Sequence, residues 1–209
     1  LTHHPFFQRM QREPVDLGHM WRLFTNIRSG LSRHFPRRLA AVVARVTDER
    51  IRSLLAKQLD EELGEGDYTK AHLVLFDDML NGLAAYKPAQ LDALDYEAGR
   101  VLESELEVPY ADADGHVGVG AAMVIEIFGK QVDRFVADQF RRQRQVAPDS
   151  LTWLHLHENL ELEHAEESLD LARLVPATPE AHAAVARGAR QVFEAGWRFF
   201  DHMYRACWR

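Results

Sequence analysis

The segment 151–175 places polar and apolar residues with the period of a helix. Seven of its positions recur at alternating steps of three and four, which puts them on one helix face. They are Leu154, His157, Glu161, His164, Ser168, Leu171 and Val175. The face begins and ends with apolar residues, so we expect it to point into a core. A buried polar group without a partner costs roughly 2–7 kcal/mol, and one metal site would satisfy both imidazoles and the carboxylate.

The same period predicts helices along most of the chain. After a lead-in at residues 1–16, the expected helices are 17–46 with a break at Pro36, 48–63, 68–86, 89–105, 117–145, 151–175 and 180–208. The chain has no strand-like alternation, internal repeat or linker. These features predict a single all-α domain over residues 1–209, built as a seven-helix bundle.

Composition narrows the class of protein. The 209 residues are 46% hydrophobic and 27% charged, which suits one domain with a sizeable core. A formal net charge of −7 argues against a nucleic-acid surface. The single cysteine, Cys207, excludes a disulfide framework and favours a reducing cytoplasm. No apolar run approaches the roughly 20 residues of a membrane span and no signal peptide is visible, so we expect a cytoplasmic protein without a membrane partner.

Three other residues of metal-ligand type occur where the helical pattern calls for an apolar residue. They are Glu62, His72 and Glu126. Glu65 competes with Glu62 because it lies seven residues before His72. A salt bridge to a buried arginine would also explain Glu126, although a lone carboxylate in so apolar a segment needs a strong partner.

Together these positions offer three carboxylates and three imidazoles. Such a set suits iron or manganese, whereas zinc held by thiolates is excluded by the lack of cysteines. The alternative for His157 and His164 is that they are ordinary core histidines bonded to carbonyl or carboxylate groups. A ferritin-like arrangement is disfavoured because it uses two good Glu-x-x-His motifs, and this chain has one, at Glu161 and His164.

The order and spacing of these residues resemble the heme-oxygenase-like diiron oxidases and oxygenases, which are relatives of TenA and PqqC. The resemblance extends from about Phe6 to Tyr204. It is carried by the segments DEELGEGDYTKAH, AAMVIEIFG, HENLELEH and GWRFFDHMY.

The resemblance implies a heme-oxygenase-like helical fold and a set of metal ligands. The implied ligands are Glu62 (or Glu65), His72, Glu126, His157, Glu161 and His164. Two departures matter. Many members have Asp where this chain has Glu161, and the helix expected at 17–46 lacks the carboxylate that some members recruit there. One metal and two metals per chain therefore both stay open, with two expected.

The resemblance also implies an enzyme that activates O2 with Fe(II) to oxidise a small organic substrate, such as one derived from an amino acid or a fatty acid. N-oxygenation, oxidative C–C cleavage and desaturation are all known in this group, and the sequence does not choose among them. Residues one turn from the ligands are expected at the substrate pocket: Phe76, Met123, Gly129, Trp153 and Ser168. A homodimer is compatible with such a domain.

Three alternatives share parts of this pattern. A TenA-like hydrolase would need a buried nucleophilic cysteine, and Cys207 near the chain end is poorly placed for that role. A PqqC-like cofactorless oxidase would have no need to bury Glu126 and Glu161 together. A non-catalytic iron-binding or partner-docking protein would take up metal without turning over a substrate.

Overall fold

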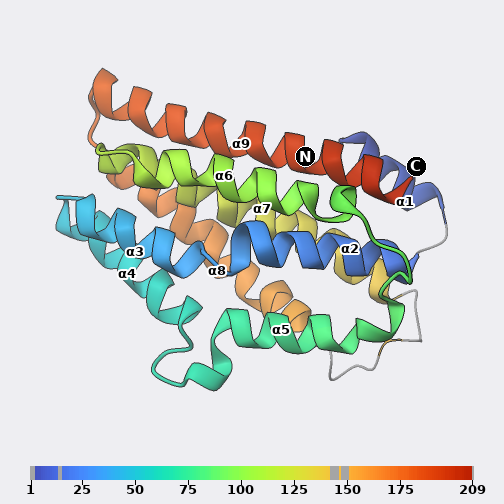
Figure 1. Ribbon diagram of the computed structural model, residues 1–209. Helices are drawn as coiled ribbons and strands as arrows, with labels where there is room; N and C mark the ends of the chain where they lie inside the picture. Colours follow the sequence, from blue (N-terminus) through green and yellow to red (C-terminus); the bar gives the residue numbers. More distant parts are fainter. Residues whose placement is uncertain (1–2, 14–15, 142–145, 147–150, 209) are drawn as a thin grey trace.

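The computed structural model describes residues 3–13, 16–141, 146 and 151–208, and for residues 157–166 it describes only the backbone. Within these residues the chain forms nine α-helices and no strand, so the all-α prediction is confirmed and the count of seven helices is wrong. The difference has two sources. The lead-in contains a helix of its own, and the expected helix at 17–46 is two helices (Figure 1).

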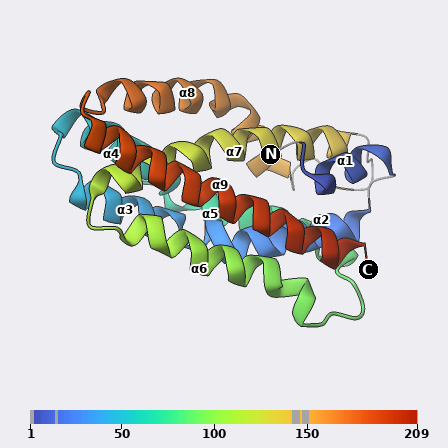
Figure 2. The same cartoon turned by 90° about the horizontal axis from the view of Figure 1, so that it is seen from above.

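The lead-in helix α1 (Pro5–Arg12) belongs to the core. Phe6 and Phe7 are fully buried, and their rings lie 5.3 and 4.5 Å from that of Phe200. His4 caps the helix by accepting a hydrogen bond from the backbone N–H of Phe6. The contacts of Phe6 and Phe7 with Phe200 hold α1 beside the C-terminal end of the last helix (Figure 2).

The next segment comprises α2 (Leu17–Ile27), a π-helical turn (Arg28–Ser32) and α3 (Phe35–Arg45). The break precedes Pro36, which lies in the first turn of α3, where its missing N–H is not needed. Gly30 lies against α6, and a Cβ atom there would come within 2.7 Å of the Gly99 carbonyl oxygen. The π turn thus brings α2 into close contact with α6.

Helix α4 (Glu49–Glu62) starts at the Asp48 cap, as expected. The helix expected at 68–86 is shorter, because a 3₁₀ turn (Tyr68–Lys70) and an extended Ala71 precede α5 (His72–Gly82), and a second 3₁₀ turn (Ala84–Tyr86) follows it. The kink at Ala71 makes His72 the first residue of α5.

Helix α6 (Glu97–Ala111) begins later and ends later than the predicted range 89–105. Asp92 and Asp95 form a capping box that opens a 3₁₀ turn (Ala93–Tyr96) and delays the α-helix. The helix then continues through Pro109, whose ring is buried in the last turn. A proline near a helix end removes only one hydrogen bond, so burial of its ring can outweigh that loss.

Three long helices complete the fold: α7 (Gly115–Arg141), α8 (Thr152–Leu174) and α9 (Pro179–Cys207). The described parts of α8 and α9 match the predicted ranges within one residue at each end. Helix α7 contacts both α8 and α9 (Figures 1 and 2). Gly120 and Gly188 permit the closest approach, because a Cβ atom on either would lie within about 2 Å of a carbonyl oxygen of the opposite helix.

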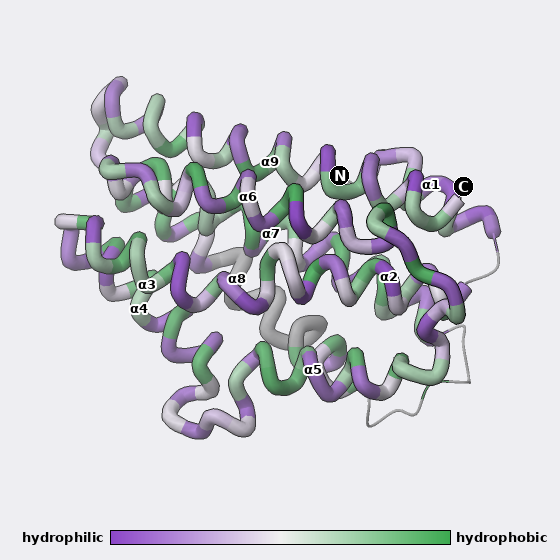
Figure 3. Tube along the Cα trace, viewed as in Figure 1, coloured by the Kyte–Doolittle hydropathy of each residue, from purple (hydrophilic) through white to green (hydrophobic). Residues whose placement is uncertain are grey.

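Green and purple segments alternate along the helices in Figure 3, as expected for amphipathic helices around a shared core. None of the helices traced in the described residues combines the length and apolar character that a membrane span requires.

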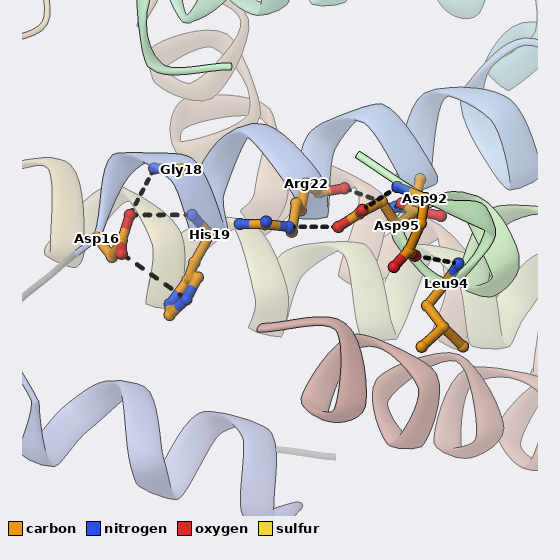
Figure 4. A network of polar contacts seen from close by, with 8 residues as sticks. Asp16, Gly18, His19, Arg22, Asp92, Leu94 and Asp95 are labelled. Carbon is orange, nitrogen blue, oxygen red and sulfur yellow. Dashed lines mark hydrogen bonds and ion pairs between the residues drawn. The ribbon is translucent and has the colours of Figure 1, made fainter. Parts of the chain in front are cut away.

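A buried polar network joins α2 to the start of α6 (Figure 4). Arg22 Nε donates to Asp95 Oδ1 at 2.6 Å, and the backbone N–H of Asp92 donates to Asp95 Oδ2 at 2.7 Å. Asn26 donates to the carbonyl of Asp95 and accepts from the N–H of Gly99, both at 2.7 Å. We call Arg22, Asn26 and Asp95 the α2–α6 network.

Candidate metal centre

A cavity of about 150 Å³ lies among the helices, and its wall is mostly apolar. Helices α2 to α9 all contribute to it. Five polar side chains reach the wall: Ser32, Glu62, His72, Glu126 and Asp133. The three predicted ligands that precede α8 therefore line one cavity.

Glu62 and His72 are brought together by the turn between α4 and α5. Gly64 and Gly66 have φ values of 86° and 84°, which glycine adopts readily, and they reverse the chain between the two helices. Glu62 Oε1 and His72 Nδ1 consequently lie 2.9 Å apart, at hydrogen-bond distance. Two ligands of one metal ion, bound at about 2.1 Å and at right angles, are also about 3 Å apart. The 2.9 Å separation is therefore compatible with a shared metal ion as well as with a hydrogen bond.

Glu65 lies in this turn with a positive φ of 52°, and its side chain is exposed. It is not among the residues that line the cavity. Of the two rival carboxylates, Glu62 is the one that contacts His72, although a ligand role for either stays a prediction.

Glu126 lies near the middle of α7, flanked by Ile125 and Ile127, and reaches the same cavity. Its negative charge, together with that of Glu62, contributes to raising the pKa of the Tyr110 hydroxyl.

Tyr110 is a buried polar residue that the sequence analysis did not single out, and it is not among the residues that line the cavity. Its side chain is 2% exposed, and burial is the main reason that its pKa lies well above the ordinary value. Its hydroxyl has no hydrogen-bond partner in the described part of the chain. An unsatisfied buried hydroxyl costs about 1–3 kcal/mol. A tyrosine at a core position of a helix resembles any other core aromatic, so the sequence contains no signal for it.

Asp133 was also missed, although a signal for it existed. It is 6% exposed and lines the cavity. It follows Glu126 by seven residues, or two helical turns, so both residues share one face of α7 about 10 Å apart. Glu126 was selected as the lone charge in an apolar segment, and the helical period that places residues seven apart on one face could have added Asp133.

Helix α8 contributes Trp153 to the cavity wall. The ring of Phe76 packs on the ring of Trp153, with centroids 4.8 Å apart. The backbone is helical through 157–166, as predicted, but the side chains of His157, Glu161 and His164 lie outside the described residues. Their ligand roles stay predictions.

The other predicted pocket residues differ in position. Gly129 lines the cavity, whereas Met123 and Ser168 are not among its lining residues. Ser168 is 1% exposed, and its hydroxyl has no partner in the described part of the chain. Cys207, partly buried at the end of α9, is also absent from the cavity wall.

Among the side chains that the structure describes, no group of three His, Cys, Asp or Glu residues is close enough to hold a metal ion. A complete metal site would therefore need at least one ligand beyond these described side chains, and the predicted ligands His157, Glu161 and His164 lie outside them. The carboxylate and imidazole groups present are of the type that suits iron or manganese.

Solved structures with the same arrangement of helices exist. A CADD-like protein of unknown function from Nostoc punctiforme superimposes with a TM-score of 0.73 at 14% identity, over 98% of this chain and 89% of that one. A domain of unknown function with a heme oxygenase-like fold from Shewanella denitrificans gives a TM-score of 0.72 at 15% identity, over 98% and 85% of the two chains. At this identity the likeness shows the heme-oxygenase-like fold alone.

Comparison with curated proteins gave no match. Residues 22–197 match the sequence profile of a family described as iron-containing redox enzyme. The matched range includes the cavity-lining Glu62, His72 and Glu126. The chain therefore belongs to the family of iron-containing redox enzymes.

Proposed function

We propose that this protein is a non-heme iron oxidase or oxygenase, with two irons per chain, that uses O2 to oxidise a small organic substrate. The observation that carries the proposal is the Glu62–His72 pair, 2.9 Å apart on the wall of a cavity that Glu126 also lines. Family membership supports the choice of iron.

In this proposal Glu62, His72 and Glu126 hold the metal together with His157, Glu161 and His164 of α8. Bound Fe(II) supplies the electrons with which O2 is reduced. Oxygen and nitrogen ligands suit Fe(II), whereas soft metals prefer sulfur ligands. Segment 17–46 lacks the carboxylate that some family members recruit, so we expect the second iron to bind less tightly than the first.

The remaining wall of the cavity serves the substrate. Leu102, Leu106, Phe199 and Phe200 give it an apolar lining, which excludes water from the reacting groups. A mostly apolar cavity of about 150 Å³ can hold a molecule the size of benzene. We therefore propose a small substrate, or one apolar portion of a larger substrate, beside the ligands.

The mostly apolar cavity favours an enzyme over a protein that only stores iron, because storage needs ligands but no substrate cavity. A metal-free enzyme is disfavoured, since it would have no evident use for Glu62 and Glu126 in the same cavity wall.

The test is oxygen uptake by protein loaded anaerobically with Fe(II). We expect uptake in proportion to the iron bound, and a visible absorption change on mixing with O2. The control is the Glu126→Ala variant under the same treatment, which should do neither. Iron retention without any oxygen uptake would support storage, and failure of the wild type to retain iron would contradict the proposal.

A further inference from the structure

Gly129 is a glycine in the interior of α7 that helix packing does not explain. Glycine is less favourable than alanine inside a helix, and a common reason for it is the close approach of a neighbouring group. That reason holds at Gly120 of the same helix, where a Cβ atom would lie 2.0 Å from the carbonyl oxygen of Val185 on α9. At Gly129, a Cβ atom would meet one atom of the described residues outside the helix's own backbone, Asp133 Oδ2, at 3.9 Å. No described neighbour therefore requires a glycine at this position.

The space beside Gly129 is the cavity. Gly129 lines it together with Ile125, Glu126, Val132 and Asp133, which lie three or four residues before or after it on α7. Positions three and four residues apart are neighbours on a helix surface, about 5–6 Å from one another. The missing side chain thus leaves a notch in the α7 wall of the cavity, one helical turn from the proposed ligand Glu126. We call this space the Gly129 notch.

Helix α9 lies level with the Gly129 notch. The rings of Phe128 and Phe193 pack together with centroids 5.6 Å apart, and Val192 and Gly196 on either side of Phe193 line the cavity. Figure 2 shows that α7 and α9 diverge beyond their close contact at Gly120, which leaves room for the cavity between them. Among the described lining residues there is no lysine or arginine that could pair with an anionic group.

We infer that Gly129 is a specificity-determining residue, at which an uncharged apolar group of the substrate lies directly against the backbone of α7. The inference rests on the proposed function. Glycine allows a ligand to approach the backbone closely, because it has no Cβ atom. A group in the notch would lie one helical turn from Glu126, and hence beside the metal that Glu126 is proposed to hold. A larger residue at position 129 would occupy the same space and exclude that group.

The test compares Gly129→Leu and Gly129→Ala with the wild type and uses benzene as the probe. A cavity of this size and apolar lining can hold benzene. Calorimetric titration of the metal-free protein measures the affinity. Gly129→Leu places an isobutyl group in the notch, so we expect the benzene affinity to fall by about 10-fold or more. Gly129→Ala fills less of the notch and should cause a smaller loss.

Thermal melting separates a role in ligand binding from a role in folding. Gly129→Ala should melt at the temperature of the wild type or above it, because alanine favours the helix and its Cβ atom would meet open space. Gly120→Ala is the matched control on the same helix. It should melt at a lower temperature, because its Cβ atom would collide with the Val185 carbonyl oxygen. Iron content after anaerobic loading should be unchanged in Gly129→Ala, since residue 129 contributes no ligand.

Three results would overturn the inference while leaving the proposed function intact. The first is a Gly129→Leu variant with the benzene affinity of the wild type. The second is a Gly129→Ala variant that melts clearly below the wild type, which would show that packing requires the glycine. The third is a metal-free wild type that binds no benzene although the iron-loaded protein takes up oxygen. A wild type that retains no iron contradicts the proposed function, and the inference then fails with it.

Discussion

The α2–α6 network and the polar side chains around the cavity are both buried or partly buried, but only the second group borders a cavity. In the network, both carboxylate oxygens of Asp95 and both side-chain amide atoms of Asn26 have partners within the chain. Around the cavity, Glu62, His72 and Glu126 line a hollow, and the Tyr110 hydroxyl has no partner in the described part of the chain.

This difference separates polar groups that stabilise the fold from polar groups that are available to a ligand. A network that satisfies itself holds two helices together and needs nothing from outside. Polar groups that line a cavity, near a buried hydroxyl without an acceptor in the described residues, can instead bind a metal ion or ligand that the chain does not supply. Variants of the two clusters should therefore differ in whether they lose stability or metal binding.

The largest effect should follow from removing a proposed ligand. Glu126→Ala and His157→Ala should each abolish most iron binding, because each removes one of the proposed metal ligands. The far-ultraviolet circular dichroism should stay close to that of the wild type. Iron content after anaerobic loading and dialysis measures the loss, and wild-type iron content in both variants would refute the ligand assignment.

The network should respond in the opposite way. Asp95→Ala should lower the free energy of unfolding by about 3 kcal/mol, because breaking a buried pair leaves the partner charge uncompensated. Urea denaturation measures the change, and iron binding by the folded variant should be preserved.

A half-exposed pair provides the control for Asp95. Arg28 Nη2 donates to Asp77 Oδ2 at 2.8 Å, and both side chains are about one-third exposed. Asp77→Ala should cost less than about 1 kcal/mol. Equal losses for Asp77→Ala and Asp95→Ala would show that the network contributes no more than a surface ion pair.

A smaller effect should come from pH, and it concerns the free energy of unfolding rather than metal binding. Burial lowers the pKa of His4, and the same cause acts on His19 and His34. The unfolded chain then holds more protons than the folded chain below the ordinary histidine pKa of about 6.5, so stability should fall as the pH drops through that value.

His4→Asn tests this account of pH. Asparagine is a good helix N-cap, so it can replace the ring as the acceptor for the N–H of Phe6. Urea denaturation at pH 7.5 and 5.5 should show a smaller loss of stability in the variant than in the wild type. An unchanged difference between the two pH values would exclude His4 as a contributor.

The smallest effect is expected at Cys207. Because this residue is absent from the cavity wall, Cys207→Ser should leave oxygen uptake by iron-loaded protein unchanged. A loss of activity without a loss of iron would instead favour a cysteine-dependent enzyme of the TenA type.

Sequence reasoning succeeded where the helical pattern was long and regular, and where a polar residue interrupted it. Helices α8 and α9 could be placed because their apolar period is long and prolines separate them. Glu62, His72 and Glu126 stood out because each replaces an apolar residue on a core face, and the structure places all three on one cavity.

It failed where tertiary contacts decide the outcome. The limits of α6 depend on a capping box at Asp92 and on burial of Pro109, which local preference does not reveal. Tyr110 differs from an ordinary core aromatic in that its buried hydroxyl has no partner in the described part of the chain, which only the packing around it decides. The distance between Glu62 and His72 depends on a turn with three consecutive residues at positive φ.

The measurement that tests the central claim most directly is a crystal structure of the iron-loaded protein with anomalous diffraction recorded at the iron absorption edge. The account predicts anomalous density within bonding distance, about 2 Å, of Glu62, His72 and Glu126, with further ligands from α8. Iron bound elsewhere, or a cavity with no anomalous density in crystals of iron-loaded protein, would contradict it.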